Sequence, residues 1–299
     1  MSDFAIQVKD LSVVFDDFIA VNKISFDVTR GEIFGFLGAN GAGKTTTIRV
    51  LCGLLRPSSG DLKVAGVGLD ADDRAIKEKV GYMSQKFTLY DDLSVEENLS
   101  FVASLRKMNR QHYLKRQKKI LDFISFELSL KELVRNLPGG IKQHVSLAAA
   151  LLHDPEIVFL DEPTAGVSPS SRERFWNLLN VLLEEKKTIF VTTHYMDEAE
   201  HCGRIALMGA GEILALDSPA NLKSHFFPNG VYELSPLRTI PYQQIQKMRS
   251  QFDFFEPYGL HYHVSHQESF ESLKNDFSIK KIIPTLEDVF IRVVEANKR

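Results

Sequence analysis

The chain has 299 residues, of which 44% are hydrophobic and 25% are charged. These values are typical of a globular protein and exclude a long disordered chain, a collagen-like repeat and a bare coiled coil. Lys and Arg total 36 against 39 Asp and Glu, a net charge of -3, so the overall charge gives no indication of nucleic-acid binding. The sequence has no apolar run of about 18 residues that predicts a membrane-spanning helix. Its first residues lack the pattern of a secretory signal.

The two cysteines, Cys52 and Cys202, lie far apart and form neither a metal-binding nor a redox spacing. We therefore predict that both are reduced thiols in a cytosolic protein.

Alternating and apolar runs predict the strands of the first 200 residues. Alternation over 5–8, 11–15 and 23–28 predicts antiparallel strands. The runs at 32–37, 156–160 and 188–193 are nearly continuously apolar, as in strands that are buried on both faces. Helical stretches lie between these runs, so the middle of the chain is predicted to form a wound α/β sheet.

Residues 94–136 contain no strand-like run and are rich in Leu, Lys, Arg and Glu. Ser94 and Glu97 have the spacing of a capping box that opens a helix. The sequence Pro138-Gly139-Gly140 ends the segment. We predict an inserted helical subdomain over about residues 87–140.

The composition shifts near Ser218-Pro219. After it we predict a strand at 231–234, a helix at 242–252, two short strands around Gly259, a helix at 268–277, a strand at 279–283 and a final helix at 286–296. The βαββαβ part of this order is that of a small ferredoxin-like domain. The predicted domains are therefore residues 1–220 and an accessory α+β domain at 221–299.

A glycine-rich motif follows the predicted strand at 32–37 and precedes a predicted helix at 46–55. It fits the pattern G-x-x-x-x-G-K-[ST], whose backbone N–H groups curl around phosphate oxygens. In this motif Lys44 is expected to reach the β- and γ-phosphates, and Thr45 to hold magnesium through its hydroxyl. An ordinary glycine turn is the alternative, but the strand–turn–helix context favours a phosphate loop. The predicted phosphate-binding residues are Gly38, Asn40, Gly41, Ala42, Gly43, Lys44, Thr45 and Thr46.

Three more candidates follow predicted buried strands. Asp161 and Glu162 come at the end of one strand and His194 at the end of another. The carboxyl ends of parallel strands are where an α/β sheet places ligand chemistry. Asp161 fits a magnesium ligand, Glu162 fits a group that polarises the attacking water, and His194 fits a γ-phosphate contact. Solvated loop acids and a structural histidine are the alternatives.

With these motifs the chain resembles the nucleotide-binding subunit of ABC transporters over roughly residues 3–220. The resemblance rests on the order and spacing of several motifs. They are Gly38 to Thr45, Gln85 in Gly81-Tyr82-Met83-Ser84-Gln85, Leu137-Pro138-Gly139-Gly140-Ile141-Lys142-Gln143, Asp161-Glu162-Pro163-Thr164 and Thr193-His194.

The resemblance implies a P-loop NTPase fold and further roles. Phe15 matches the aromatic that stacks on adenine, and Gln85 the residue that joins the magnesium site to the helical subdomain. Gly139 and Gly140 match backbone donors that face the nucleotide of a partner subunit. The family further implies that Phe87, Leu89 and Tyr90 line a groove for a permease helix, although three such residues could equally be core.

The tail is similar to that of ATPases that serve multidrug and polysaccharide-type exporters, in Pro284 to Ile291 and in Met208 to Ile213 followed by Asp217-Ser218-Pro219. The implied protein is an ATP-hydrolysing export subunit that uses ATP and Mg²⁺. Its implied catalytic residues are Glu162, His194 and Lys44, and its metal-site residues are Thr45, Gln85 and Asp161. Its expected partners are a second ATPase subunit, identical or homologous, and integral-membrane permease subunits, with no nucleic acid. It is expected in the cytoplasm, on the inner face of the membrane.

Two positions depart from the family pattern. Pro138 stands where the family usually has Ser, and Ser168 where it usually has Asp. Pro138 removes a hydroxyl donor at a helix N-terminus, whereas Ser168 before Pro169 still predicts a good helix cap.

Two other functions are consistent with a phosphate loop. One is a soluble ABC ATPase of translation or DNA repair, which the single motif set and the lack of a long coiled coil disfavour. The other is a regulatory module that binds ATP without turnover, which Glu162 and His194 disfavour. The nearby His261, His263 and His266 could form a zinc site, but incidental histidines on a strand are favoured.

Overall fold

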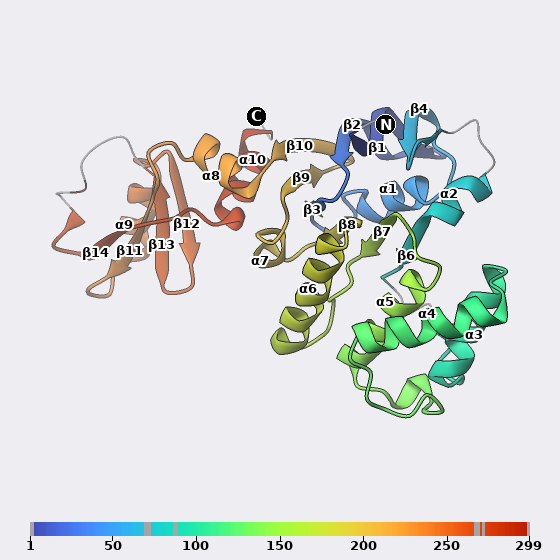
Figure 1. The fold of residues 1–299 in the computed structure, drawn as a ribbon. Coiled ribbons are helices and arrows are strands. Elements are labelled where there is room, and N and C mark those ends of the chain that lie inside the picture. The colour runs from blue at the N-terminus through green and yellow to red at the C-terminus, as the bar shows by residue number, and fades with distance from the viewer. Residues whose placement is uncertain (1–2, 69–72, 86–88, 266–269, 271–272, 298–299) are drawn as a thin grey trace. The chain divides into compact units, whose positions relative to one another are not determined.

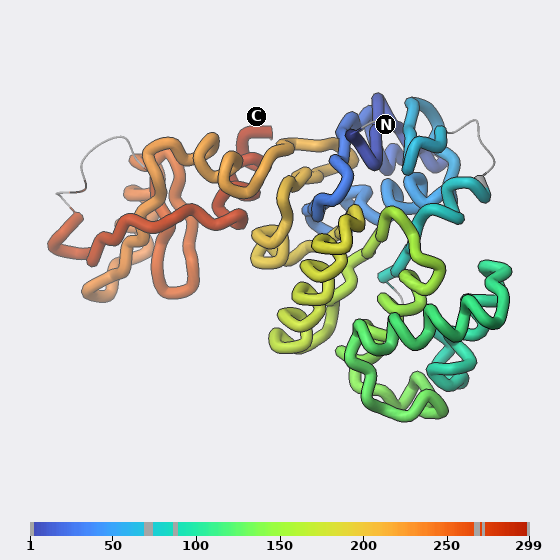
Figure 2. The backbone as a smooth tube through the Cα atoms, in the orientation of Figure 1, coloured from blue at the N-terminus to red at the C-terminus, as the bar shows by residue number. Residues whose placement is uncertain are grey.

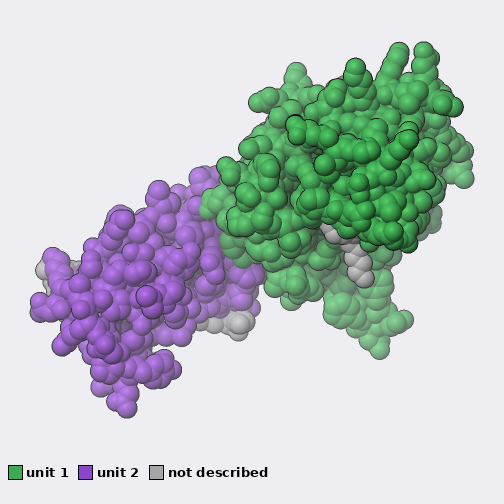
Figure 3. All heavy atoms as spheres, turned by 90° about the horizontal axis from the view of Figure 1, so that it is seen from below, with its two compact units in different colours: residues 1–213 green, residues 214–299 purple. Residues whose placement is uncertain are grey.

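The computed structural model describes residues 3–68, 73–85, 89–265, 270 and 273–297. The chain divides into two compact units, residues 1–213 and residues 214–299 (Figure 3). None of the helices in these described ranges has the length and apolar character needed to cross a bilayer.

Strands up to residue 217 form two sheets. They are β1 (Phe4–Phe15), β2 (Phe18–Thr29), β3 (Ile33–Gly38), β4 (Ser59–Val64), β5 (Val67–Gly68), β6 (Val80–Met83), β7 (Ile157–Asp161), β8 (Thr188–Thr193), β9 (Arg204–Gly209) and β10 (Glu212–Asp217). One sheet has the order β2-β1-β4-β5 and is antiparallel. The other has the order β10-β9-β3-β8-β7-β6, and its strands from β9 to β6 are parallel.

The helices of this part of the chain lie on both sides of the parallel strands and in a separate helical segment (Figures 1 and 2). They are α1 (Lys44–Leu51), α2 (Asp73–Lys79), α3 (Val95–Leu105), α4 (Arg110–Phe123), the 3₁₀ helix η1 (Val134–Asn136), α5 (Gly139–Leu151), α6 (Pro169–Glu184) and α7 (Met196–Ala199). Helix α1 packs against β2 of one sheet and against β3 and β7 of the other. Helix α6 packs against β8.

The predicted central strands are confirmed, and every residue of β3, β7 and β8 is buried. Five phenylalanines fill the space between the two sheets, with ring centroids 5.3–6.1 Å apart. Aromatic pairs at these separations stabilise a core by more than their buried area alone accounts for. The five phenylalanines are Phe26, Phe34, Phe36, Phe159 and Phe190.

Two element predictions in this unit were wrong in their bounds. Residues 5–8 and 11–15 are parts of one strand, β1, because the chain passes Asp10 with a φ of 50° and a register shift instead of turning back. The helix predicted at 46–55 is α1, which begins at Lys44 directly after Gly43 and ends before Gly53, whose φ is 65°.

The helical segment follows the prediction more closely. Ser94 Oγ accepts a hydrogen bond from the Glu97 N–H while the Glu97 carboxylate accepts one from the Ser94 N–H, so the capping box is confirmed. Pro138 stands at the N-cap of α5, as expected from Pro138-Gly139-Gly140.

The second unit contains helix α8 (Pro219–Phe226), which the sequence analysis did not predict although Ser218 caps it and Pro219 is its first residue. Its other elements are β11 (Val231–Pro236), α9 (Tyr242–Arg249), β12 (Phe254–Tyr258), β13 (His261–Ser265), β14 (Phe277–Ile282) and α10 (Leu286–Ala296). The strands form an antiparallel sheet in the order β12-β13-β11-β14. That is the strand order of a ferredoxin-like sheet, as predicted.

Residues 268, 269, 271 and 272 of the helix predicted at 268–277 lie outside the described residues. Its described end is a turn over residues 273–276, and Phe277 already belongs to β14. Helix α9 ends at Arg249 rather than at residue 252.

A buried pair of side chains joins β13 to α10. The Nδ1 atom of His263 lies 2.9 Å from Asp288 Oδ1, and both side chains are almost fully buried. The other oxygen of Asp288 accepts hydrogen bonds from the N–H and hydroxyl of Thr285, the N-cap residue of α10. His263 is therefore a structural residue of this sheet, and His266 lies outside the described residues.

We predict that Asp288→Ala lowers the free energy of unfolding of residues 214–299 by about 2 kcal/mol, since it removes a helix cap and the partner of a buried histidine. Urea unfolding followed by circular dichroism measures the change. Glu287→Ala, on the exposed side of the same helix turn, is the control and should stay within about 0.5 kcal/mol. Equal unfolding midpoints for the two variants would contradict the assignment.

Candidate active site

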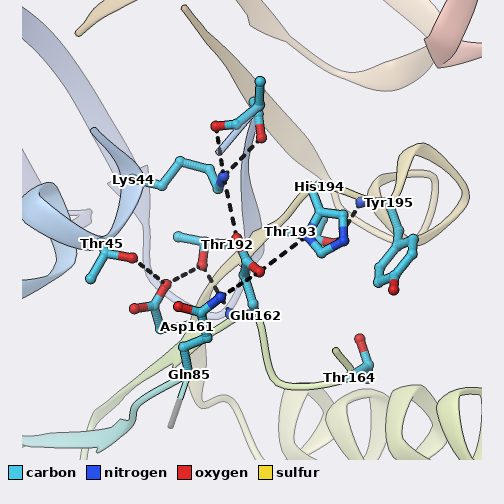
Figure 4. Close-up of polar contacts among 12 residues, drawn as sticks. Lys44, Thr45, Gln85, Asp161, Glu162, Thr164, Thr192, Thr193, His194 and Tyr195 are labelled. Atoms are coloured by element: carbon cyan, nitrogen blue, oxygen red, sulfur yellow. Dashed lines mark hydrogen bonds and ion pairs between the residues drawn. The ribbon is translucent and has the colours of Figure 1, made fainter. Parts of the chain in front are cut away.

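The carboxyl ends of four parallel strands meet at one edge of the six-stranded sheet. They are the ends of β3, β7, β8 and β6, which lead to the glycine-rich loop, to Asp161-Glu162, to His194 and to Gln85. The topology thus brings together residues that are up to 156 positions apart in sequence, from Gly38 to His194 (194 − 38). Figure 4 shows the polar contacts among them.

The glycine-rich loop requires its glycines for conformation and for space. Gly43 has a φ of 102°, a region that side chains rarely adopt. A Cβ atom at this position would lie only 2.5 Å from the carbonyl oxygen of Ala20. Helix α1 begins at the next residue, so the loop presents the first N–H groups of a helix, as a phosphate loop does.

Lys44 is almost fully buried and is surrounded by oxygen atoms. Its Nζ donates hydrogen bonds to the carbonyl oxygens of Gly38 (2.8 Å) and Ala39 (3.1 Å). It also forms an ion pair with Glu162 Oε1 at 3.4 Å, where the two side chains are only 4% and 6% exposed. The ammonium group is therefore held inside the curl of the loop (Figure 4).

Asp161 is fully buried at the end of β7. Its Oδ1 accepts hydrogen bonds from the hydroxyls of Thr192 (2.7 Å) and Thr45 (3.2 Å). Its Oδ2 is buried and has no hydrogen-bond partner among the described residues. Burial raises the pKa of Asp161 above its ordinary value, the nearby Glu162 raises it further, and the two hydroxyl hydrogen bonds oppose this shift.

Glu162 is held in an unusual backbone conformation with a φ of 48°. Its N–H donates to the carbonyl and hydroxyl oxygens of Thr192, at 3.1 and 3.0 Å, and these bonds fix the turn. Its Oε2 accepts a hydrogen bond from Gln85 Nε2 at 2.9 Å and lies 3.1 Å from His194 Nδ1. Three of the predicted residues, Lys44, Gln85 and His194, thus converge on this one carboxylate (Figure 4).

The remaining predicted nucleotide contacts lie around this cluster or away from it. Phe15 ends β1 with an exposed ring that is free to stack on a flat ligand, and Asn40, Gly41 and Thr46 lie on the loop and in the first turn of α1. Gly139 and Gly140 begin α5 and form no hydrogen bond with the Lys44–Glu162 cluster in the described part of the chain.

The two departures from the family pattern lie at neighbouring helix N-termini. Pro138 is the N-cap of α5 and supplies no side-chain hydrogen bond, whereas Ser168 caps α6 by accepting from the Ser171 N–H. A Cβ added to Gly140 would lie 2.7 Å from Ser171 Oγ, so the first turns of α5 and α6 pack closely. The sequence indicated each cap but not that the two caps lie together.

The proposed permease groove is described only in part, because Phe87 lies outside the described residues. Leu89 is buried, so it belongs to the core, whereas Tyr90 is exposed and its ring packs edge-on against Phe101 of α3. One turn further along α3, Leu105 is also exposed.

Four polar residues hold the site together although the sequence assigned them no role, and two of them, Thr164 and Thr193, stand in the quoted motifs. Thr192 and Thr193 are consecutive on β8 and therefore point to opposite faces of the sheet. Thr192 supports Asp161 and Glu162, while Thr193 and Thr164 both donate to the buried carboxylate of Glu198. Threonine is common on strands, so their type alone gave no signal.

Cys52 and Cys202 are both buried and free. Burial raises the pKa of each thiol above its ordinary value. Protonated, enclosed thiols are unreactive, so neither takes part in the site.

Fold and site together define a P-loop nucleotide-binding protein: a glycine-rich loop before a helix, with a lysine, an Asp-Glu pair and a histidine at one sheet edge. A model of the family described as ABC transporter matches residues 21–165. A probable multidrug ABC transporter ATP-binding protein of Escherichia coli is 42% identical over 219 residues, which span 73% of this chain and 38% of that protein. A Nod factor export ATP-binding protein of Cupriavidus metallidurans is 34% identical over 84% of this chain and 85% of its own length.

Solved structures agree. An ATP-binding subunit of an ABC transporter superposes with a TM-score of 0.67 at 27% identity, over 74% of this chain and 93% of its own. A dimeric ATP-binding cassette in a post-hydrolysis state with ADP and Pi superposes with a TM-score of 0.65 at 25% identity, over 71% and 98%. The chain belongs to the ABC transporter family of ATP-binding proteins.

We predict that Thr192→Val lowers the free energy of unfolding by about 1–3 kcal/mol, because it leaves the buried Asp161 carboxylate without its shortest hydrogen bond. Thr192→Ser keeps the hydroxyl and should recover most of the loss. Urea unfolding of the nucleotide-free protein tests this. A Val variant as stable as the unmodified protein would show that the hydroxyl is not needed to hold Asp161.

Proposed function

We propose that this chain is the ATP-hydrolysing subunit of an export system that drives a separate transmembrane permease. The observation that carries the proposal is the convergence of Lys44, Gln85 and His194 on the Glu162 carboxylate, directly beside the glycine-rich loop. Hydrolysis needs a group that positions water next to the γ-phosphate, together with cations that neutralise the charge that develops there.

In this proposal the glycine-rich loop binds the phosphates. Its N–H groups and the N-terminus of α1 favour anions, and Phe15 supplies an exposed aromatic surface for the adenine. Lys44 Nζ exchanges the carbonyl oxygens of Gly38 and Ala39 for the β- and γ-phosphate oxygens. Phosphate oxygens carry full charge, so they are stronger acceptors than these carbonyls.

The residues present fit a magnesium ion. Asp161 Oδ2 is a buried carboxylate oxygen with no hydrogen-bond partner in the described part of the chain, and the Thr45 hydroxyl lies 3.2 Å from the other oxygen. Mg²⁺ prefers carboxylate, hydroxyl and phosphate oxygens. Asp161 and Thr45 would hold the ion, with Gln85 as an additional oxygen ligand. When bound, it neutralises charge on the β- and γ-phosphates.

Glu162 is the proposed general base. Its carboxylate already accepts a hydrogen bond from Gln85 and lies beside His194, so the group that would meet the water is fixed from two sides. Binding of phosphate to Lys44 frees Oε1 from its ion pair to polarise the water. His194 is the proposed contact to the γ-phosphate.

We further propose that two ATPase subunits, identical or homologous, enclose two nucleotides. Gly139 and Gly140 at the N-terminus of α5 form no hydrogen bond with this chain's own Lys44–Glu162 cluster among the described residues. Their N–H groups are thus available for an anion held by another subunit. One similar solved structure, a dimeric cassette bound to ADP and Pi, supports this arrangement.

The proposed permease site is a groove of about 600 Å³ next to the exposed stripe of Tyr90, Phe101 and Leu105. Its lining combines exposed leucines of the α1–β4 connection and of α3 with basic side chains of α2 and the end of α3, which outnumber the one acidic side chain, Glu78. It includes Leu54, Lys77, Tyr82, Leu105, Arg106 and Lys107. A partner that presents an amphipathic helix with acidic flanks fits such a surface, and it would keep this chain on the inner face of the membrane.

The direction of transport is proposed from the relatives, whose names describe multidrug transport and Nod factor export. We also propose residues 1–220 as the ATPase domain, with a helical subdomain at about 87–140, and residues 221–299 as an accessory domain. The separate sheet and core of the second unit support the latter.

Two substitutions separate binding from turnover. Lys44→Ala should weaken ATP binding sharply, because it removes the cation of the phosphate loop. Glu162→Gln should bind ATP about as tightly as the unmodified protein but lose most of its turnover, because an amide cannot take up a proton from water. Equilibrium titration and phosphate release measure the two. Unchanged ATP affinity in the first variant, or unchanged turnover in the second, would refute the assigned roles.

Pro138→Ser should raise ATP turnover of the isolated protein. A hydroxyl at the N-cap of α5 adds a donor toward the partner's phosphate, and a hydrogen bond to a charged group is worth about 1.5–3 kcal/mol, or roughly ten- to a hundredfold. Backbone N–H groups recover part of this in the unmodified protein. A Pro138→Ser variant that folds and dimerises normally without faster turnover would show that the missing hydroxyl does not limit the reaction.

A further inference from the structure

Glu198 is a buried acid that the proposed chemistry does not use. It lies on the short helix α7, four residues after His194, and is only 1% exposed. A buried carboxylate is costly unless all its oxygens are satisfied. In this chain both oxygens are satisfied, and their partners come from three separate segments.

The first two partners are threonine hydroxyls. Thr193, directly before His194, donates to Glu198 Oε2 at 2.6 Å. Thr164, two residues after Glu162, donates to Glu198 Oε1. Both threonines are themselves buried, so these bonds are shielded from water, where hydrogen bonds to a charged acceptor are strong.

The third partner is Arg172, in the first turn of α6. Its Nε forms an ion pair with Glu198 Oε1 at 3.3 Å, and its guanidinium stacks over the ring of Tyr195 at 4.0 Å from the centroid. Tyr195 follows His194 directly, and its N–H donates to the Thr193 hydroxyl at 3.0 Å. The residues on both sides of His194 are therefore tied to the Glu198–Arg172 pair.

These contacts form a closed loop of interactions that includes the proposed catalytic pair, Glu162 and His194. Thr164, two residues after Glu162, donates a hydrogen bond to Glu198, and so does Thr193, the residue before His194. The loop is completed by His194 Nδ1, which lies 3.1 Å from Glu162 Oε2. Figure 4 labels Thr164 and Thr193 together with Glu162 and His194. Without Glu198, no other side chain in the described part of the chain joins Thr164 to Thr193.

We propose that Glu198 is a positioning residue for ATP hydrolysis. Its carboxylate fixes the loop after Glu162 against the segment that carries His194. It thereby keeps His194 Nδ1 next to the Glu162 carboxylate. The inference rests on the proposed function. It assigns Glu198 no contact with nucleotide, so ATP binding is independent of it, whereas turnover depends on it through His194.

The test compares Glu198→Gln with Asp197→Asn in the full chain. Gln keeps the shape but can no longer accept from both threonines, because its amide nitrogen is only a donor. Asp197 is the matched control, since its exposed carboxylate also contacts Arg172, at 3.2 Å, but touches neither threonine. Glu198→Gln should lower kcat about tenfold and leave the Kd for ATP within about twofold. Asp197→Asn should leave both unchanged.

A double-mutant cycle distinguishes positioning from general destabilisation. In a His194→Ala background, Glu198→Gln should cause no further loss of kcat, because its effect passes through His194. An equal loss of kcat in both backgrounds, or no loss in either, would overturn the proposal. Should Glu198→Gln fail to fold, Thr164→Val against Thr164→Ser gives the same comparison, with the loss expected only in the Val variant.

A readout that needs no turnover separates this inference from the proposed function. The ring NMR signals of His194 in the nucleotide-free protein should shift in Glu198→Gln and stay unchanged in Asp197→Asn. Unshifted signals would overturn the positioning role even in an active enzyme. A protein that hydrolyses no ATP, but whose His194 signals shift as expected, would refute the proposed function and leave the positioning of His194 standing.

Discussion

The buried ion pair between Lys44 and Glu162 is the interaction on which the site depends. Both side chains are almost completely shielded from water, and removing two charges from water costs more than their mutual attraction usually returns. The pair persists because each member has other partners, backbone carbonyls for Lys44 and the Gln85 and His194 side chains for Glu162. An anion that approaches the loop finds a desolvated cation in place.

The parallel sheet makes this pair possible. Lys44 follows β3 and Glu162 follows β7, and β8 lies between these two strands. The strand β8 supplies the connection, because its last two threonines point to opposite faces. Thr192 fixes Asp161 and Glu162 on one face, and Thr193 reaches Glu198 on the other. The end of β8 thus holds both the Asp161 side and the His194 side of the site.

Local sequence patterns predicted the parts of the molecule that depend on local physics. The glycine-rich motif, the continuous apolar runs of β3, β7 and β8, and the Ser94–Glu97 capping box all reflect short-range requirements, and the structure contains each of them. Lys44 was found in the glycine-rich motif, and Asp161, Glu162 and His194 were found because strand ends in a parallel sheet converge. The family resemblance added Gln85.

What the sequence did not show depends on contacts between distant segments. Nothing local marks Thr164, Thr193 and Glu198 as partners, because 34 positions separate Thr164 from Glu198. Strand β1 continues through Asp10 because this residue adopts a positive φ. Asp tolerates a positive φ but does not require it, so the sequence alone did not indicate a continuous strand. The adjacency of the Pro138 and Ser168 caps likewise follows from the packing of α5 on α6.

A crystal structure of the full chain with Mg²⁺ and a non-hydrolysable ATP analogue tests the central claim most directly. We expect the phosphates on the loop from Gly38 to Thr45, with Lys44 Nζ leaving Gly38 and Ala39 to contact them. We also expect a metal ion on Thr45 and Asp161 Oδ2, the oxygen that has no hydrogen-bond partner among the described residues. Nucleotide bound elsewhere, or a Lys44–Glu162 pair that stays at 3.4 Å with no phosphate contact, would contradict it.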